Sequence, residues 1–269
     1  MMSMAVLDVL DQIKRGYIRD MVKQNKRIDN RAFDEYRKVE VEQGMITSAE
    51  GSARARIGKS EVLVGVKIGV GSPFPDRPSE GILMTNAEFL PLASSTFESG
   101  PPREDSIELA RVVDRGIRSA NAVDIASLSL GEDEEGRPKV WITFLDIYVI
   151  DHDGNLQDAA GLAAMSAILN TQLPKYEDGQ IVREEKTGPL PSKATALSCT
   201  FGKIADKIIL DPCYAEEVSL DSKLTIATVK DHICACQKSG GGGLSRAELD
   251  YCMDLALKKG EELRGKLKA

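Results

Sequence analysis

Ser106–Asp124, which reads SIELARVVDRGIRSANAVD, is the stretch that decides how the chain is organised. On a helix at about 100° per residue, its apolar residues share one broad arc. Arg111, Arg115 and Arg118 fall in a narrow sector on the opposite side. The pattern predicts an amphipathic helix with Ser106 as its N-cap, packed on the body through Leu109, Ala110, Val112, Val113, Gly116, Ile117 and Ala120.

The arginines form a ladder, because the spacing i, i+4, i+7 stacks side chains on one helical face. The ladder spans about 10 Å at ~1.5 Å rise per residue. Each guanidinium group can bind a phosphate through two hydrogen bonds, so the ladder suits a polyanion. The alternative is a solvated helix face on which Glu108 and Asp114 act as partial counterions. The spacing alone leaves both interpretations open.

The composition argues against an independent nucleic-acid-binding protein. The formal net charge is −7, whereas binding by bulk electrostatics requires a basic protein. Aromatic residues make up only 5% of the chain, which disfavours a platform for stacking bases. Any contact with RNA must therefore be local or shared with a partner.

The five cysteines, all in the last third of the chain, indicate free thiols in a reducing compartment. Their number is odd, and no second cysteine pair or histidine cluster has zinc spacing. No signal peptide is visible, and the longest apolar stretch, Val140–Ile150, is too short to span a bilayer and contains Asp146. We expect a cytoplasmic protein without a membrane segment.

The spacing of apolar residues changes along the first 170 residues, from a helical pattern to strand-type alternation and back to a helix. Three- and four-residue steps predict an amphipathic helix from about Ala5 to Gln24. Alternation then predicts strands, with Arg54 and Arg56 on one strand face that is either solvated or in contact with RNA. An Ala-rich stretch, apolar nearly all round, predicts a buried helix at Leu156–Leu169. The expected strands are 38–44, 52–57, 61–70, 81–92 and 140–151.

Polar Glu177–Pro191, with two glycines and two prolines, marks a boundary between two lobes. The second lobe repeats the order of strands followed by a helix, and Ser245–Glu248 forms a capping box. The expected fold is α+β, with two β-rich lobes, each with packed helices, and an N-terminal helix. We divide the chain into residues 1–26, 27–178 and 190–269.

No catalytic trio can be read from the spacing of His152 and His232, the only histidines. The Asp151–Asp153 cluster could hold a metal but fits a turn better. Asp206 and Asp211 flank an apolar strand, and each could act as a general acid or simply end the strand. The sequence therefore predicts no catalytic residue and no metal ligand.

Several stretches together resemble the ribonuclease PH family. Arg27–Arg31 resembles the R-x-D-x-R opening of these proteins, and Ile107–Ala110 resembles the I-E-L-S start of their main helix. Further similarities cover their first hairpin at 51–62, the L-D-x-x-x-x-E-[DE] strand at 210–217 and the glycine run before Leu244–Ser245. The resemblance implies the ribonuclease PH-like fold. The N-terminal helix and the sequence GPLP at 188–191 point to the non-catalytic ribonuclease-PH-type subunits of the archaeal exosome.

The departures from the family pattern imply that this chain is not itself an enzyme. Phosphorolytic members bind the attacking phosphate with an Arg-Arg pair before the I-E-L motif. Here those positions hold Glu104–Asp105 or Asp105–Ser106, and acids repel phosphate. The G-[ST]-R turn that cradles phosphate reads Gly154–Leu156 here, so its arginine is absent. Asp211 matches a family carboxylate, whereas Asp206 lies one residue out of register with the other.

The resemblance further implies a ring of three heterodimers, in which this chain alternates with catalytic ribonuclease-PH-type subunits. Such a ring works with RNA-binding cap subunits and degrades single-stranded RNA from its 3′ end with phosphate. In it this chain shapes the partner's active site and binds RNA through Arg111, Arg115 and Arg118, without a cofactor. The alternatives are an autonomous phosphate-dependent 3′→5′ exoribonuclease, with Lys203 or Lys207 recruiting phosphate, and a scaffold without RNA contact.

Overall fold

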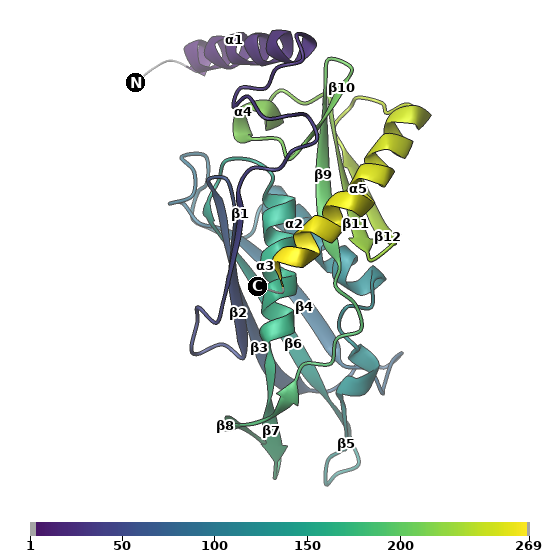
Figure 1. Cartoon of the computed structure of the whole chain (residues 1–269). Helices are drawn as coiled ribbons and strands as arrows, with labels where there is room; N and C mark the ends of the chain where they lie inside the picture. Colours follow the sequence, from purple (N-terminus) through teal and green to yellow (C-terminus); the bar gives the residue numbers. More distant parts are fainter. Residues whose placement is uncertain (1–3, 268–269) are drawn as a thin grey trace.

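The computed structural model describes residues 4–267, and the side chains from residue 12 onward. Its larger sheet has the order β1-β2-β3-β6-β4, and β5 also pairs with β6 (Figure 1). Neighbouring strands are antiparallel except β4, which runs parallel to β6 at the edge of the sheet. The strands are β1 (Val39–Gln43), β2 (Gly51–Ile57), β3 (Ser60–Gly71), β4 (Ile82–Phe89), β5 (Ser129–Glu132) and β6 (Pro138–Asp151).

The smaller sheet has the order β10-β9-β11-β12, and all its pairs are antiparallel. Helix α5 (Arg246–Lys266) packs against β9 and β11, and the capping box predicted at Ser245–Glu248 begins it. The four-residue helix α4 (Tyr214–Glu217) joins β10 to β11. The strands are β9 (Leu197–Ile204), β10 (Lys207–Leu210), β11 (Ser222–Val229) and β12 (His232–Ser239).

Helix α3 (Leu156–Asn170) lies between the two sheets and contacts β2 and β3 on one side and β9 on the other (Figure 1). Because both sides are covered, the helix is buried nearly all round, as its composition predicts. The apolar residues of both sheets, α3 and α5 form one contiguous core. The predicted α+β architecture is confirmed, and its two lobes share this core.

Helix α2 (Glu104–Ser119) packs its predicted apolar face on β4 and α3. The prediction that Ser106 is the N-cap is wrong, because Arg103 takes that position and the helix begins at Glu104. Ser106 lies inside the first turn, where its hydroxyl donates to the Arg103 carbonyl at 2.9 Å. Glu104 and Asp105 favour the earlier start, since negative charges stabilise the first turn of a helix.

The predicted N-terminal helix is present as α1 (Met4–Lys23). Its second half is anchored by Ile18 and Val22, which pack with Ile204 and Ile209 of the smaller sheet. Arg19 adds an ion pair with Asp221 at 2.7 Å. The three- and four-residue steps that predict this helix begin with Val6, Val9 and Leu10, whose side chains lie outside the described residues.

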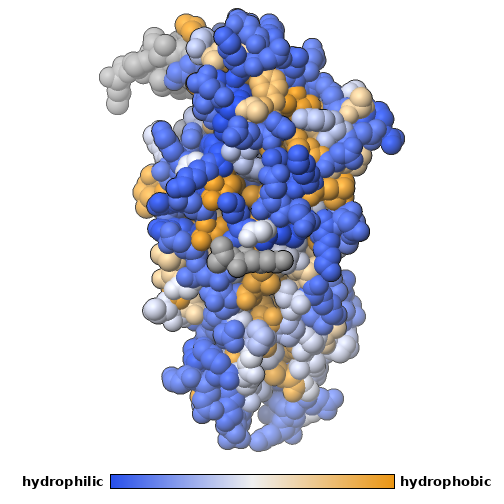
Figure 2. Space-filling view, in the orientation of Figure 1, coloured by the Kyte–Doolittle hydropathy of each residue, from blue (hydrophilic) through white to orange (hydrophobic). Residues whose placement is uncertain are grey.

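The polar segment chosen as a lobe boundary has regular structure. β7 (Gln172–Glu177) and β8 (Gln180–Pro189) form a separate two-stranded hairpin that projects from the larger sheet (Figure 1). The stretch from 190 to 196 then leads into β9. None of the helices within residues 4–267 is long and apolar enough to cross a membrane. Figure 2 shows a mostly hydrophilic face on which apolar side chains form small separate patches.

Candidate nucleic-acid interface and neighbouring cleft

The three arginines of the predicted ladder all lie on the exposed side of α2. Arg111, Arg115 and Arg118 are exposed, whereas the residues on the opposite arc of the helix are buried. The structure thus gives these side chains the common face that the sequence predicts. Whether this face contacts RNA is not decided by the geometry and stays a prediction.

The arginines differ in how far the protein already uses their hydrogen-bond donors. Arg118 donates to Asp114 at 2.6 Å and to the carbonyl oxygen of Leu83 on β4. Arg115 donates to the Gln237 amide oxygen on β12 at 2.5 Å. Arg111 has no hydrogen-bond or ion-pair partner among residues 4–267. Arg111 and Arg115, with no carboxylate partner there, carry the charge available to a phosphate.

Arg54 and Arg56, the other basic pair considered for RNA contact, are matched by carboxylates. Arg54 pairs with Glu42 at 2.7 Å, and both arginines pair with Glu61. The pairs connect neighbouring strands across one sheet face. This geometry favours the solvated strand face over a phosphate-binding surface.

Beside the ladder, a cleft of about 280 Å³ lies between the first turns of α2 and α3 and the helix α4. Three carboxylates line it: Asp105 and Glu108 from α2, and Glu217 from α4. Lys223 is the cleft's lysine, and its ammonium group pairs with Glu217 at 2.9 Å. The charged side chains of the cleft therefore disfavour an anion.

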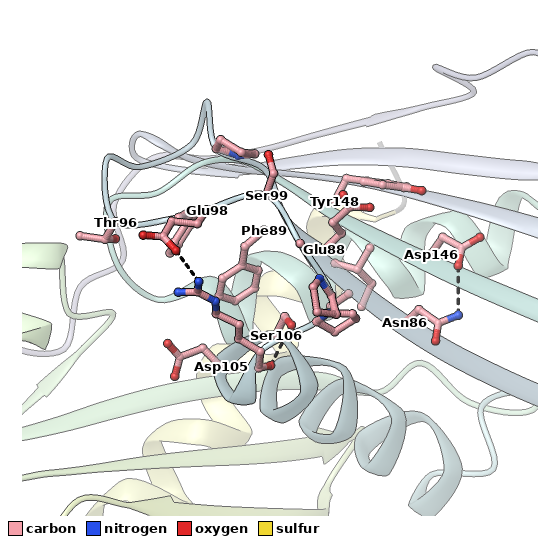
Figure 3. A pocket seen from close by; sticks show the side chains of 18 residues that line it. Asn86, Glu88, Phe89, Thr96, Glu98, Ser99, Asp105, Ser106, Asp146 and Tyr148 are labelled. Atoms are coloured by element: carbon pink, nitrogen blue, oxygen red, sulfur yellow. Dashed lines mark hydrogen bonds and ion pairs between the residues drawn. The ribbon is translucent and has the colours of Figure 1, made fainter.

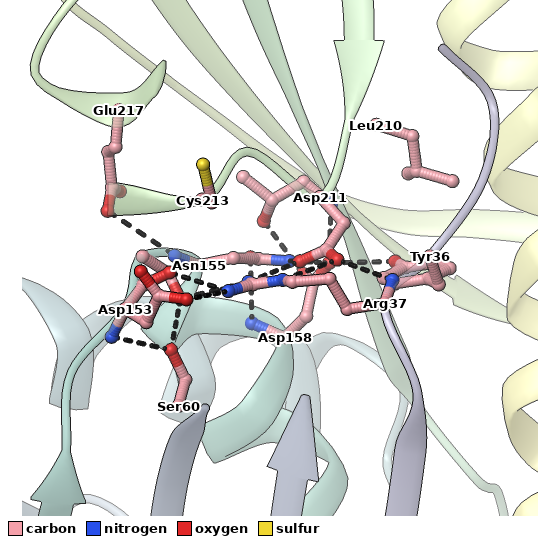
Figure 4. Close-up of polar contacts among 12 residues, drawn as sticks. Tyr36, Arg37, Ser60, Asp153, Asn155, Asp158, Leu210, Asp211, Cys213 and Glu217 are labelled. Atoms are coloured by element: carbon pink, nitrogen blue, oxygen red, sulfur yellow. Dashed lines mark hydrogen bonds and ion pairs between the residues drawn. The ribbon is translucent and has the colours of Figure 1, made fainter. Parts of the chain in front are cut away.

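Glu217 also occupies the N-terminus of α3, where unpaired backbone N–H groups and the helix dipole favour an anion. The Asn155 N–H donates to the Glu217 carboxylate at 3.3 Å (Figure 4). Leu156, the first residue of α3, puts an apolar side chain into the cleft. The Glu217 carboxylate thus already uses one N–H donor at this helix N-terminus.

One wall of the cleft is aromatic. Phe97 stacks on His152 with ring centroids 5.3 Å apart, and His152 and Tyr214 form a T-shaped pair with centroids 5.1 Å apart. Burial lowers the pKa of His152, which favours the neutral imidazole. The Gly154 N–H donates to His152 Nδ1 at 3.4 Å, which leaves the proton of the neutral ring on Nε2.

Asp211 lies behind the cleft as the centre of a buried clamp (Figure 4). Its carboxylate accepts hydrogen bonds from Arg31 at 2.9 Å, from Arg37 at 2.7 Å and from Asn155 at 2.7 Å. Burial alone would raise the pKa of Asp211, but the hydrogen bonds and charge of Arg37 outweigh it and lower the pKa. A buried, fully bonded carboxylate that ionises this readily is unsuited to act as a general acid.

Asp158 continues the clamp into the core. It accepts from the Tyr36 hydroxyl at 2.7 Å, from the Thr200 hydroxyl at 2.7 Å and from Asn155 at 2.9 Å. Burial raises the pKa of Asp158 to about 6, although these hydrogen bonds oppose the rise. The network joins α3 to β9 and to the segment before β1, so it fixes the two lobes around the cleft.

The remaining candidates lie away from the cleft. Asp206 sits at the tip of the β9–β10 hairpin with its side chain 96% exposed, and His232 is exposed beside Asp231. Arg37 was not singled out from the sequence, and Asn155 was considered only as part of the Gly154–Leu156 turn, although both residues complete the clamp. A useful signal was the Gly154–Asn155 pair before an apolar helix, because glycine and asparagine adopt positive φ most readily, as both do here.

Comparison with family models gives two matches that together span most of the chain. Residues 35–174 match domain 1 of the 3′ exoribonuclease family, and residues 194–259 match domain 2 of that family. Residues 175–193, which lie between the two matches, contain the end of β7 and all of β8.

Similar proteins and structures agree with these matches. The chain is 47% identical to the Exosome complex component Rrp42 of Thermococcus gammatolerans, covering 97% of this chain and 96% of that protein. It is 48% identical to the protein of the same name from Methanocella arvoryzae, with 97% of each covered. Among solved structures, the Archaeoglobus fulgidus exosome with RNA bound to the active site has a chain with a TM-score of 0.88 and 46% identity, covering 96% and 99% of the two chains. The archaeal exosome core has a chain with a TM-score of 0.85 and 42% identity, covering 97% of this chain and 99% of that chain.

Proposed function

The chain belongs to the 3′ exoribonuclease, or ribonuclease PH, family, and on this premise we propose that it is a non-catalytic subunit of an archaeal exosome. The resemblance predicted from the sequence is confirmed by the family matches and by the relatives. In the proposed role the chain shapes the active site of a catalytic partner and holds single-stranded RNA near it.

The observation that carries the non-catalytic role is Leu156 at the N-terminus of α3, in a cleft lined by carboxylates. In phosphorolytic members of the family this helix start helps to hold the attacking phosphate. Here Leu156 stands where those members have arginine, and the Glu217 carboxylate accepts the Asn155 N–H. Asp105 and Glu108 add like charge across the cleft. A phosphate entering the cleft would have to displace one carboxylate and approach two more.

RNA holding is assigned to the arginine ladder of α2. Arg111 and Arg115 have no carboxylate partner among the described residues, and Arg118 lies on the same face beside Asp114. The net charge of −7 fits a local contact, because one positive stripe can meet RNA while the rest of the surface meets partners.

The proposed partners are a catalytic ribonuclease-PH-type subunit, RNA-binding cap subunits and single-stranded RNA. The names of the relatives and the RNA-bound exosome structure support them. We propose three heterodimers that alternate in a hexameric ring, located in the cytoplasm.

An activity assay tests the non-catalytic role directly. Release of nucleoside diphosphates from a single-stranded 3′ tail is measured with phosphate for this chain, for the catalytic partner, and for their mixture. We expect no release by this chain alone and more release by the mixture than by the partner. Robust activity of the isolated chain would overturn the proposal in favour of an autonomous phosphorolytic enzyme.

A charge reversal tests the ladder. Arg115→Glu should lower the activity and RNA affinity of the assembled complex without preventing assembly, because the side chain is exposed and, within residues 4–267, bonded only to Gln237. Arg246→Glu, the same change at a side chain that is 85% exposed on α5, is the matched control and should leave RNA binding intact. Loss of assembly by Arg115→Glu would make α2 an interface instead.

A further inference from the structure

The cleft between α2 and α3 is rich in hydrogen-bond acceptors that the protein leaves unused. Asp105 and Glu108 accept no hydrogen bond and form no ion pair within residues 4–267. Glu217, by contrast, already accepts from Lys223 and from Asn155. Two carboxylates therefore remain for a ligand, and both prefer a ligand with N–H or O–H donors.

The side chain of Gln157 independently indicates that the cleft suits a ligand with a hydrogen-bond donor. Its side chain lines the cleft from the first turn of α3 and is only 9% exposed. The buried amide oxygen Oε1 has no hydrogen-bond partner in the described part of the chain. An unpaired buried acceptor is costly, and native proteins rarely keep one without a structural or functional reason. Because Gln157 lines the cleft, a rotation of its amide group toward the cleft would let a donor there satisfy this oxygen.

The aromatic wall of Phe97, His152 and Tyr214 adds a surface that favours positive charge. The faces of aromatic rings attract cations, most strongly where water is partly excluded. The Phe97 and His152 rings stack at 5.3 Å, and the Tyr214 ring lies nearly perpendicular to His152 with centroids 5.1 Å apart. The wall stands beside the carboxylates on the same cleft.

A second cleft of about 340 Å³ adjoins the first and extends its negative charge (Figure 3). The two clefts share Phe89, Phe97 and Asp105. In the second cleft Glu88 and Asp146 add carboxylates, while Arg103 is paired with Glu98. An approaching ligand thus meets an acidic surface on both sides of the α2 N-terminus.

We propose that the cleft between α2 and α3 binds an organic cation, an alkylammonium or guanidinium group, through Asp105, Glu108 and Gln157. A metal ion fits poorly, because within residues 4–267 no three carboxylate, histidine or cysteine side chains converge as metal ligands would. RNA fits poorly too, because its phosphates would face the acids. The cation belongs either to a free polyamine or to a lysine or arginine side chain of a partner subunit.

Calorimetric titration of the full chain with spermidine, at low salt and without RNA, tests the site. We expect saturable binding with one site per chain. Asp105→Asn combined with Glu108→Gln should weaken binding about tenfold or more, because two charged acceptors are lost. The matched control is Glu134→Gln with Glu184→Gln, which removes two exposed carboxylates elsewhere and should leave the affinity within twofold. No binding, or an equal loss in both variants, would overturn the proposal.

Gln157→Met separates a ligand contact from a structural role. Methionine has a similar length and no buried acceptor to satisfy, so the variant should be at least as stable as the wild type. It should nevertheless bind spermidine several times more weakly. Unchanged affinity would remove Gln157 and its unpaired oxygen from the argument.

The same titration on the assembled complex identifies the source of the cation. If a partner side chain fills the cleft, spermidine binds the isolated chain but not the complex, and the double variant weakens assembly. If the ligand is free, both forms bind it equally. The inference goes beyond the proposed function, and its failure on the isolated chain would leave the RNA-holding role untouched.

Discussion

Asp211→Asn is expected to destabilise the protein strongly, because it keeps the shape of the side chain and removes the charge at the centre of the clamp. The Asp211 side chain is fully buried, and those of Arg31 and Arg37 are only 10% and 8% exposed. Asparagine can accept at one atom only, and its NH₂ group would face guanidinium donors. The substitution therefore leaves two nearly buried cations short of their counterion.

Removing one partner of a buried ion pair costs about 3 to 5 kcal/mol. The lower part of this range applies here, because Arg31 keeps Asp29 at 2.6 Å and Arg37 keeps Asp153 at 3.4 Å. A loss of about 3 kcal/mol corresponds to a fall in Tm of roughly 6 to 12 °C for a chain of this size.

Thermal unfolding of the isolated chain at pH 7, followed by circular dichroism, measures this effect. Asp206→Asn is the control, because the same substitution at a side chain 96% exposed should change stability by about 0.5 kcal/mol or less. The pKa of Asp211 is lowered in the folded chain, so its contribution is present above about pH 4 and is lost as the pH falls through the folded value. The deficit of the variant should shrink in acid. An unchanged Tm at pH 7 would refute the clamp and leave the carboxylate available for another role.

Three further substitutions test other parts of the structure. Tyr36→Phe removes a hydroxyl that donates to Asp158 at 2.7 Å, so the pKa of Asp158 should rise above about 6, as read from its carboxyl ¹³C shift. Because folding raises the pKa of Asp158, the protonated carboxyl group contributes fully to the stability of the folded chain below about pH 4, and this contribution is lost as the pH rises through about 6. An unchanged Asp158 pKa in Tyr36→Phe would contradict the hydrogen-bond network. Gly154→Ala should cost at least about 1 kcal/mol in urea unfolding, because φ is +84° and a Cβ would lie 2.5 Å from the Cys213 carbonyl carbon; wild-type stability would show that the turn can shift. Ser245→Ala should cost about 1 kcal/mol by removing the N-cap of α5, and Ser127→Ala, at an exposed hydroxyl outside any long helix, is its control.

Local periodicity was enough to predict the elements that face the core. The apolar arc of α2 and the all-round burial of α3 follow from spacing within single helices, and the structure has both. The β7–β8 hairpin was missed because its residues are almost all half-buried or exposed, so no alternation of polarity marks the strands. The predicted N-cap of α2 was three residues too late, because Ser106, a good capping residue, donates its hydroxyl to the Arg103 carbonyl instead.

The clamp could not be predicted from local sequence patterns, because the residues that form it are far apart in the chain. Arg37 meets Asp211 across 174 positions, and Asn155 meets it across 56. Asp206 and Asp211 flank the same short strand and look equivalent in sequence. The fold separates them, since a hairpin tip exposes Asp206 while the end of β10 turns Asp211 into the interior. Such assignments require knowledge of which distant segments meet.

The acidic residues in the first turn of α2 and the arginine ladder on the same helix are best understood together. Acids in its first turn and an arginine in its last turn complement the helix dipole, so helix stability alone explains the order of the signs. It does not explain why Arg111 and Arg115, on one exposed stripe, have no carboxylate partner within residues 4–267, or why Asp105 and Glu108 face a cleft with an amide oxygen that is unpaired there. If one end of the helix repels phosphate and the other attracts it, RNA is kept out of this chain's own cleft and held along the ladder. In the proposed non-catalytic role the chain would thereby direct the RNA toward a partner's active site, and the Arg115→Glu and Asp105→Asn/Glu108→Gln variants should therefore fail in different assays.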